Sequence, residues 1–188
     1  NVSKDLNFGD ITELNPTGLP NFDMMNFSFP CKDFSVAGKM KGLNDNNSIT
    51  HSGLYYYGMN IVRAKKPKYV LVENVKGITF KKFENDFKLI INNFNTEGYN
   101  TYWKLMNASD FSHPQNRERM IMICVRKDVD NGEFKFPNHR EYKATLKDII
   151  LDEVDEKYYN DEIFITQTSA KNNGLITLEI KLGNLLYP

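Results

Sequence analysis

A cysteine between a proline and a polar loop is the residue of this sequence best suited to nucleophilic chemistry. Cys31 follows Pro30, and residues 32–50 beyond it are rich in Gly, Asn, Asp and Ser. A free thiol is mostly protonated at neutral pH, but a nearby cation or a helix N-terminus favours the reactive thiolate. Free cysteine is also a common small hydrophobe of protein cores. The sequence alone therefore leaves Cys31 as either a nucleophile or a buried core residue.

Three charged residues further along the chain could serve the same chemistry. Glu73 follows the apolar stretch 70–72; a partly buried carboxyl there can carry a proton, although such a residue often simply lies on the surface. Arg117 and Arg119 precede the apolar run 120–125, and their spacing puts both on one face of a strand. Paired guanidinium groups suit a phosphate or a base carbonyl, and a charged lip at the strand end is the alternative.

Zinc and disulfide chemistry are not indicated by the cysteines. The chain has two, Cys31 and Cys124, which lie far apart and lack the paired spacing of zinc ligands. A reducing compartment therefore suits the protein. Cys124 lies inside the apolar run 120–125, so we expect it in the core.

A neutral total charge hides a basic middle segment. The 24 Lys and Arg balance 24 Asp and Glu, yet residues 61–126 carry 12 basic and 6 acidic side chains, a net charge of +6. Electrostatic attraction is local on the scale of a Debye length, so a neutral sum does not exclude a nucleic-acid partner. The densest basic group is either solvated surface or a contact for phosphates, and it comprises Arg63, Lys65, Lys66 and Lys68.

Strands and helices alternate along the chain and predict an α/β fold. Apolar runs predict strands at 24–29, 69–72, 99–106 and 120–125, and helical spacing of apolar residues predicts helices over 52–65, capped by Ser52, and 83–94. This alternation is typical of a parallel sheet covered on both faces, whose chemistry lies beyond the carboxyl ends of the strands. Cys31 and Glu73 both fall at such ends, and the long loop 32–50 is of a kind that is usually functional.

The length of 188 residues fits one domain, or one domain and part of a second. No apolar run approaches the roughly 18 to 20 residues of a membrane span, so we expect a soluble protein. The composition changes after Lys127: residues 152–161 are acidic, and residues 162–186 are strand-like. This change predicts a second, smaller unit or its beginning.

Short sequence blocks follow one another from about residue 7 to residue 127 without a large gap. They are Gly9-Asp10-Ile11-Thr12, Phe29-Pro30-Cys31 with Phe34-Ser35 and Gly38, Ser52-Gly53-Leu54, Lys65-Lys66-Pro67-Lys68, Glu73-Asn74-Val75-Lys76, the stretch from Leu105 to Asp110 and the stretch from Pro114 to Arg119. In number and order these blocks resemble the DNA (cytosine-5)-methyltransferase family, most closely its bacterial restriction–modification type. The resemblance implies a Rossmann-like fold that uses S-adenosylmethionine as cofactor and double-stranded DNA as substrate.

The resemblance also implies a role for each candidate residue. Cys31 would attack C6 of a cytosine flipped out of the duplex, and Glu73 would hold or protonate N3, so that C5 accepts the methyl group. Arg119 would contact the base carbonyl O2, and Arg117 would support the site or bind phosphate. The carbonyl of Phe29 would accept from the exocyclic amine. The expected cofactor-binding residues are Asp10, Ile11, Pro30 and Leu54, and the expected substrate-binding residues are Phe29, Ser35, Asn74 and Val75.

The chain departs from the family pattern at two positions and at its ends. Lys32 stands where the family usually has Gln, and His51 where Arg is common; neither change removes a reacting group. We expect the family's first block, a strand followed by Phe-x-Gly-x-Gly, upstream of Asn1, so this chain alone should bind cofactor poorly. On this view residues 1–127 are the catalytic domain without that cofactor-binding motif, and residues 128–188 begin the target-recognition region.

Two other functions remain open. The chain could be a catalytically silent homologue that acts as a DNA-binding or regulatory partner. It could also belong to the tRNA-methylating branch of the family, which usually has Pro where this chain has Phe29 before Pro-Cys. We expect a monomeric enzyme of the bacterial cytoplasm that associates with the nucleoid and binds neither a metal nor a membrane.

Overall fold

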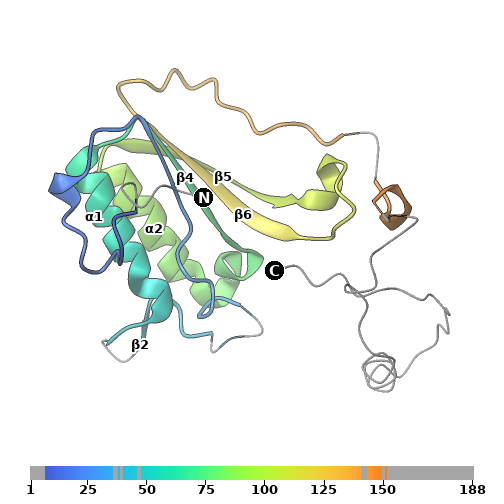
Figure 1. The fold of residues 1–188 in the computed structure, drawn as a ribbon, viewed down its shortest axis with the longest axis horizontal. Coiled ribbons are helices and arrows are strands. Elements are labelled where there is room, and N and C mark those ends of the chain that lie inside the picture. The colour runs from blue at the N-terminus through green and yellow to red at the C-terminus, as the bar shows by residue number, and fades with distance from the viewer. Residues whose placement is uncertain are drawn as a thin grey trace. The chain divides into compact units, whose positions relative to one another are not determined.

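The computed structural model describes residues 7–35, 38, 40–45, 48–140, 144–149 and 151 (Figure 1). The chain divides into two compact units, Asn1–Ala144 and Thr145–Pro188. The predicted acidic segment 152–161 and the strand-like segment 162–186 lie outside the described residues. The fold of the first unit positions all the candidate site residues.

A four-stranded sheet with the order β1-β4-β6-β5 forms the centre of the first unit. Its strands are β1 (Met24–Phe27), β4 (Tyr69–Val75), β6 (Glu118–Arg126) and β5 (Tyr99–Asn107). A separate two-stranded hairpin joins β2 (Asn44–Asp45) to β3 (Ser48–Ile49) within the loop after Cys31. All four predicted strands are confirmed, with boundaries that shift by a few residues.

The prediction of a parallel sheet is wrong, because only one of the three strand pairs is parallel. β1 runs parallel to β4, whereas β6 runs antiparallel to both β4 and β5. The reason is the connection between β5 and β6. It spans residues 108–117, which is shorter than the dozen or more residues of a crossover, so the two strands pair as a hairpin.

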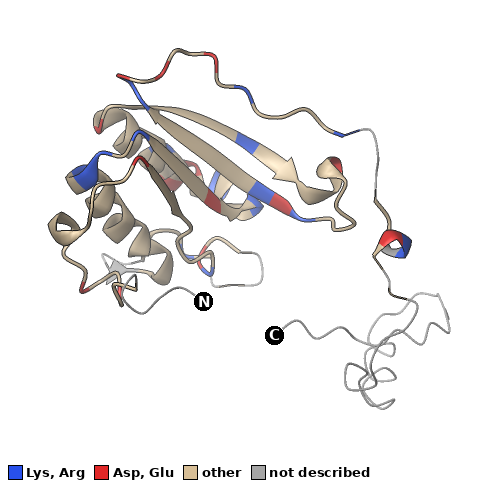
Figure 2. Cartoon of the chain, turned by 45° about the horizontal axis from the view of Figure 1, so that its top comes forward, with Lys and Arg blue, Asp and Glu red and all other residues tan. Residues whose placement is uncertain are grey.

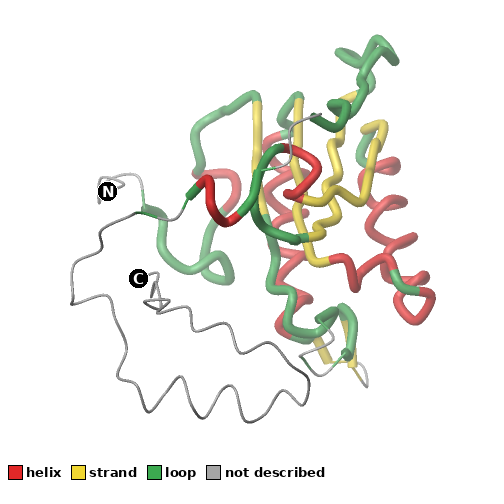
Figure 3. The backbone as a smooth tube through the Cα atoms, turned by 90° about the vertical axis from the view of Figure 1, so that its right-hand side faces the viewer, coloured by secondary structure: helices red, strands yellow, loops and turns green. Residues whose placement is uncertain are grey.

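Two helices, α1 (Tyr55–Lys65) and α2 (Glu84–Thr96), pack alongside the strands (Figures 1 and 3). Along β4, and between Met120 and Cys124 of β6, the even-numbered residues are buried and the odd-numbered ones are mostly half-buried; the apolar ones among the buried residues share one core with these helices. Because side chains alternate between the faces of a strand, both helices cover the same face. The expectation that helices cover both faces of the sheet is therefore wrong in the part of the chain that the structure describes.

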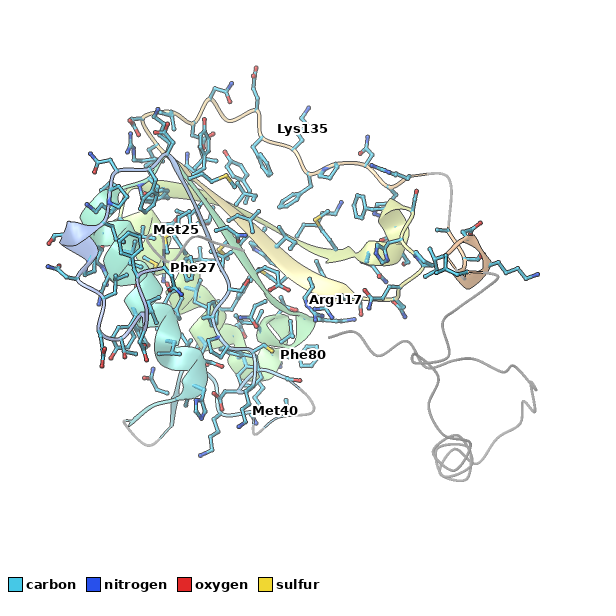
Figure 4. The ribbon with its side chains drawn as sticks, viewed as in Figure 1. Met25, Phe27, Met40, Phe80, Arg117 and Lys135 are labelled. Atoms are coloured by element: carbon cyan, nitrogen blue, oxygen red, sulfur yellow. The ribbon has the colours of Figure 1, made fainter. Side chains whose placement is uncertain are left out.

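The core lies between this sheet face and the two helices. Its members include Val70 and Val72 of β4, Met122 of β6 and Phe94 of α2, and all four are fully buried. From β1, the neighbouring side chains Met25 and Phe27 pack against the same core (Figure 4). Cys124 also lies there fully buried, as the sequence predicts.

The first predicted helix begins differently from the expectation. A 3-10 turn, His51–Leu54, precedes α1, and its N-cap is Thr50, whose hydroxyl accepts from Gly53 N. Ser52 is not the cap, because its hydroxyl is buried and donates to the Pro30 carbonyl instead. The second predicted helix is confirmed as α2. Among the described residues no helix has both the length and the apolar character to cross a bilayer.

We predict that Tyr99→Phe will destabilise the fold by about 1 to 2 kcal/mol. The buried Tyr99 hydroxyl donates to the Pro67 carbonyl at 2.6 Å, and burial raises the pKa of Tyr99 to about 12. Phenylalanine leaves that carbonyl without its donor, which typically costs this much. Urea unfolding measures the loss. Tyr69→Phe is the matched control, since Tyr69 is 42% exposed; an equal loss in both variants would contradict the prediction.

Candidate active site

A pocket of about 330 Å³ opens where β4 ends and β6 begins. Its lining comprises Ser28, Phe29, Pro30, Cys31, Glu73, Asn74, Val75, Arg117 and Arg119. Cys31 is exposed there, which excludes the buried-core interpretation of this residue. All four residues expected to be catalytic thus line one pocket. Figure 4 labels Arg117 at this end of the sheet.

Glu73 and Arg119 form an ion pair inside the pocket. Arg119 Nε lies 2.8 Å from Glu73 Oε1, with side chains 24% and 31% exposed, respectively. The pairing follows from the register, because β6 runs antiparallel to β4 and places Arg119 opposite Val75, on the same face as Glu73. On the other side Ser28 Oγ donates to Glu73 Oε2 at 3.1 Å. One oxygen of the carboxylate therefore faces the Arg119 cation, and the other accepts a hydrogen bond from Ser28.

The backbone before Cys31 is held by two buried polar side chains. Asn74 Nδ2 donates to the Phe29 carbonyl at 3.1 Å, and Ser52 Oγ donates to the Pro30 carbonyl at 2.6 Å. Ser52 N in turn donates to Asp33 Oδ2 at 3.0 Å, and Asp33 N donates to Ser52 Oγ. Since buried hydrogen bonds rigidify the groups that they satisfy, these contacts fix the path of the chain on both sides of Cys31.

Beyond Cys31 the chain is anchored to helix α2 near Gly42. Gly42 has a φ of +74°, and a Cβ atom there would come within 2.1 Å of Asp86 Oδ2. Leu43 N donates to the same oxygen at 3.4 Å, and Thr50 Oγ1 donates to the Gly42 carbonyl. Only glycine combines this left-handed backbone with so close a neighbour. The anchor ties the loop after Cys31 to α2.

We predict that Asp86→Asn will stabilise the protein at neutral pH and leave it unchanged near pH 3. Burial raises the pKa of Asp86 above its ordinary 3.8. The folded chain then binds the proton more readily than the unfolded chain, so stability falls as the pH rises through this window. Asparagine removes the buried charge but can still accept from Leu43 N. Urea unfolding at both pH values measures the change.

Glu84→Gln is the matched control for this pH dependence. Glu84 lies in the same first turn of α2, but its pKa is lowered because Lys88 donates to it. A lowered carboxyl pKa contributes stability above its unfolded value, so glutamine should cost stability at neutral pH. A gain in both variants, or in neither, would contradict the interpretation of Asp86.

Comparison with known proteins identifies the family of the chain. The family model of C-5 cytosine-specific DNA methylases matches residues 1–187. The chain belongs to this family. The type II methyltransferase M2.ScrFI of Lactococcus lactis subsp. cremoris is 40% identical over 153 residues, which cover 81% of this chain and 42% of that protein. M.HhaI of Haemophilus parahaemolyticus is 38% identical over 143 residues, with 76% and 42% covered. The chain thus spans less than half the length of these relatives.

Solved structures show the same fold. Dnmt2 of S. pombe matches with a TM-score of 0.61 and 19% identity over 86% of this chain and 51% of that one. A DNMT2 mutant of Spodoptera frugiperda matches with a TM-score of 0.58 and 25% identity over 86% and 50%. The described sheet and helices are therefore part of the Rossmann-like α/β fold of C5 methyltransferases, as the sequence predicts.

Four residues expected from the family resemblance lie outside the pocket lining: Asp10, Ile11, Leu54 and Ser35. Asp10 is exposed, and its carboxylate accepts from Thr12 N at 2.8 Å and from Thr12 Oγ1, which lowers its pKa. Ile11, Leu54 and Ser35 are half-buried. Their roles stay predictions, as does the role of Phe29, whose carbonyl already accepts from Asn74.

The basic group before β4 favours the interpretation as solvated, ion-paired surface. Lys66 Nζ and Arg63 Nε pair with Glu97, and Lys68 Nζ lies 3.1 Å from Asp23 Oδ1. This group lies at the start of β4, whereas the Cys31 pocket lies at its end. Figure 2 shows further basic segments at the end of the sheet where β6 begins. There Arg117 lines the pocket together with Arg119.

Two contributors to the site were missed by the sequence analysis, Ser28 and Asp33. Phe27, the last residue of β1, pairs with Val72 of β4, so the next residues, Ser28 and Glu73, lie side by side. The parallel pairing of β1 and β4 was therefore the signal that could have identified Ser28. For Asp33 no local pattern points to Ser52. Among the described residues no group of His, Cys, Asp and Glu could hold a metal ion.

Proposed function

We propose that the protein methylates C5 of a cytosine flipped out of duplex DNA, through a covalent bond between Cys31 Sγ and cytosine C6. The observation that carries this proposal is the pocket in which an exposed Cys31 lies beside the Glu73–Arg119 pair. A thiol nucleophile next to a carboxyl is the pair of groups that this chemistry needs. We place the protein among the type II restriction–modification enzymes on the names of its relatives.

Each group has a distinct task at the base. Cytosine C6 is a poor electrophile until N3 is protonated or strongly hydrogen-bonded, so Glu73 reaches N3 while the Cys31 thiolate adds to C6. The addition moves electron density to C5, which becomes nucleophilic. After C5 has been methylated, its proton passes to water, the Sγ–C6 bond breaks with its electron pair on sulfur, and N3 returns its proton to Glu73, which restores the Cys31 thiolate. Arg119 contacts the carbonyl O2, while Arg117 supports the site or binds a phosphate.

The remaining binding roles concern the duplex. Flipping a base costs a few kcal/mol, which contacts to the phosphate backbone offset. The loop after Cys31 closes over the flipped base and excludes water. The Phe29 carbonyl accepts from the exocyclic amine, and Ser35, Asn74 and Val75 support the bound base.

S-adenosylmethionine is the methyl donor in this proposal, and it supplies an electrophilic methyl group. Of the residues expected around it, only Pro30 lines the pocket, while Asp10 is engaged with Thr12 on the surface. We propose residues 1–127 as the catalytic domain and residues 128–188 as part of the target-recognition region.

The test is methyl transfer by the purified full-length protein that contains this chain. With labelled S-adenosylmethionine and mixed-sequence duplex DNA, we expect 5-methylcytosine in the digested product. DNA binding without any 5-methylcytosine would favour a catalytically silent DNA-binding partner instead. Methylation of tRNA but not of duplex DNA would favour the tRNA branch, although Phe29 before Pro-Cys favours DNA. Size-exclusion chromatography would test the expected monomer.

A further inference from the structure

We infer that Ser28 is a positioning residue for the Glu73 carboxyl; this inference rests on the proposed function. Ser28 directly follows β1, whose last residue, Phe27, pairs with Val72 in the parallel register. The next residues along the two strand directions are Ser28 and Glu73, so their side chains are neighbours. Ser28 Oγ donates to Glu73 Oε2 at 3.1 Å, and both residues line the Cys31 pocket.

Glu73 makes two contacts, an ion pair and a hydrogen bond, through different oxygens of its carboxyl group. Arg119 Nε contacts Oε1 at 2.8 Å, and the Ser28 hydroxyl contacts Oε2. One contact alone would leave the plane of the carboxyl group free to rotate, whereas an ion pair at one oxygen and a hydrogen bond at the other restrain it. A carboxylate has about four acceptor directions, so each oxygen keeps one for the substrate.

A fixed carboxyl plane matters because of the shape of the cytosine edge. Ring N3, once protonated, and the exocyclic amine are adjacent donors that match two carboxylate oxygens side by side. This match needs both oxygens of Glu73 in place before the base arrives. Ser28 suits this task because its short side chain has one rotatable bond to the hydroxyl, and the end of β1 fixes its backbone.

The test measures how fast the full-length protein forms a covalent adduct with DNA. The probe is a mixed-sequence duplex in which 5-fluorocytosine replaces cytosine, supplied with S-adenosylmethionine. Fluorine at C5 blocks the proton loss that would release the enzyme. We expect Ser28→Ala to lower the single-turnover rate about tenfold, as for the loss of one hydrogen bond to a charged group, with DNA affinity unchanged. Ser28→Thr, which keeps the hydroxyl, should stay within about threefold of the parent rate.

Two further variants separate positioning from a general effect on the fold. Thr17→Ala is the matched control, since Thr17 Oγ1 also donates to a side-chain oxygen, Asn15 Oδ1, at 2.8 Å on an exposed surface outside the pocket. It should leave the rate unchanged. If Ser28 acts through Glu73, Ser28→Ala should have no further effect on the slow residual rate of Glu73→Gln.

Each result decides one question. If Ser28→Ala reacts at the parent rate, or slows Glu73→Gln by a further tenfold, the positioning role is wrong while the proposed function stands. If threonine fails to restore the rate, the hydroxyl is not what matters, and the inference is again wrong. If the parent protein forms no adduct, the proposed function fails, and this inference fails with it.

Discussion

Replacement of Cys31 by serine will abolish the covalent adduct with 5-fluorocytosine DNA and lower methyl transfer by about 10³-fold or more. Cys31 supplies the exposed thiol of the pocket lining. In the proposed mechanism its thiolate is the species that adds to C6. A serine hydroxyl is far less acidic, so almost no alkoxide is present at neutral pH. Removal of a nucleophile costs factors of this size or larger in other enzymes. Denaturing electrophoresis of the protein–DNA mixture measures the adduct.

The second cysteine provides the control for this prediction. Cys124 is fully buried in β6, and burial raises the pKa of its thiol far above the ordinary value. We expect Cys124→Ala to form the adduct like the parent protein, although with a lower stability because a small cavity replaces the sulfur. If the adduct survives in Cys31→Ser and disappears in Cys124→Ala, the nucleophile is Cys124 and the prediction is wrong.

Much of the fold follows from local sequence patterns. The unbroken apolar run 120–125 predicts the core of β6, and helical spacing from Phe83 to Phe94 predicts α2. Strand direction does not follow in the same way, since an apolar run has the same pattern in either direction. The short connection between β5 and β6 was the available signal, because it is too short for a crossover.

The site was predictable where it depends on strand ends, and unpredictable where it depends on contacts across the sheet. Cys31 and Glu73 follow apolar runs, which placed them at one edge. The pairing of Arg119 with Glu73 depends on the antiparallel register of β4 and β6, which no local pattern encodes. The same holds for Ser52, whose sequence pattern resembles a helix cap but whose hydroxyl meets the Pro30 carbonyl, 22 residues away.

Glu73→Gln will lower the rate of adduct formation and of methyl transfer by about 10²- to 10⁴-fold. Glutamine keeps the shape of the side chain and an acceptor for Ser28, but it has no acidic proton to give to N3. Loss of a positioned general acid typically has an effect of this size. The neutral side chain also leaves Arg119 without its partner charge, so the guanidinium that is proposed to contact O2 of the base is held less firmly. Single-turnover methylation with saturating DNA measures the loss.

A neighbouring glutamate offers a close control for charge and ion pairing. Glu118 also accepts from a cation, with Lys76 Nζ at 2.7 Å from its Oε2, and its side chain is 39% exposed against 31% for Glu73. It does not line the pocket, so Glu118→Gln should change the rate less than about threefold, in line with the small value of an exposed ion pair. Equal losses in the two variants would show that the rate depends on the charge of this end of the sheet, and Glu73 would then have no specific role at N3.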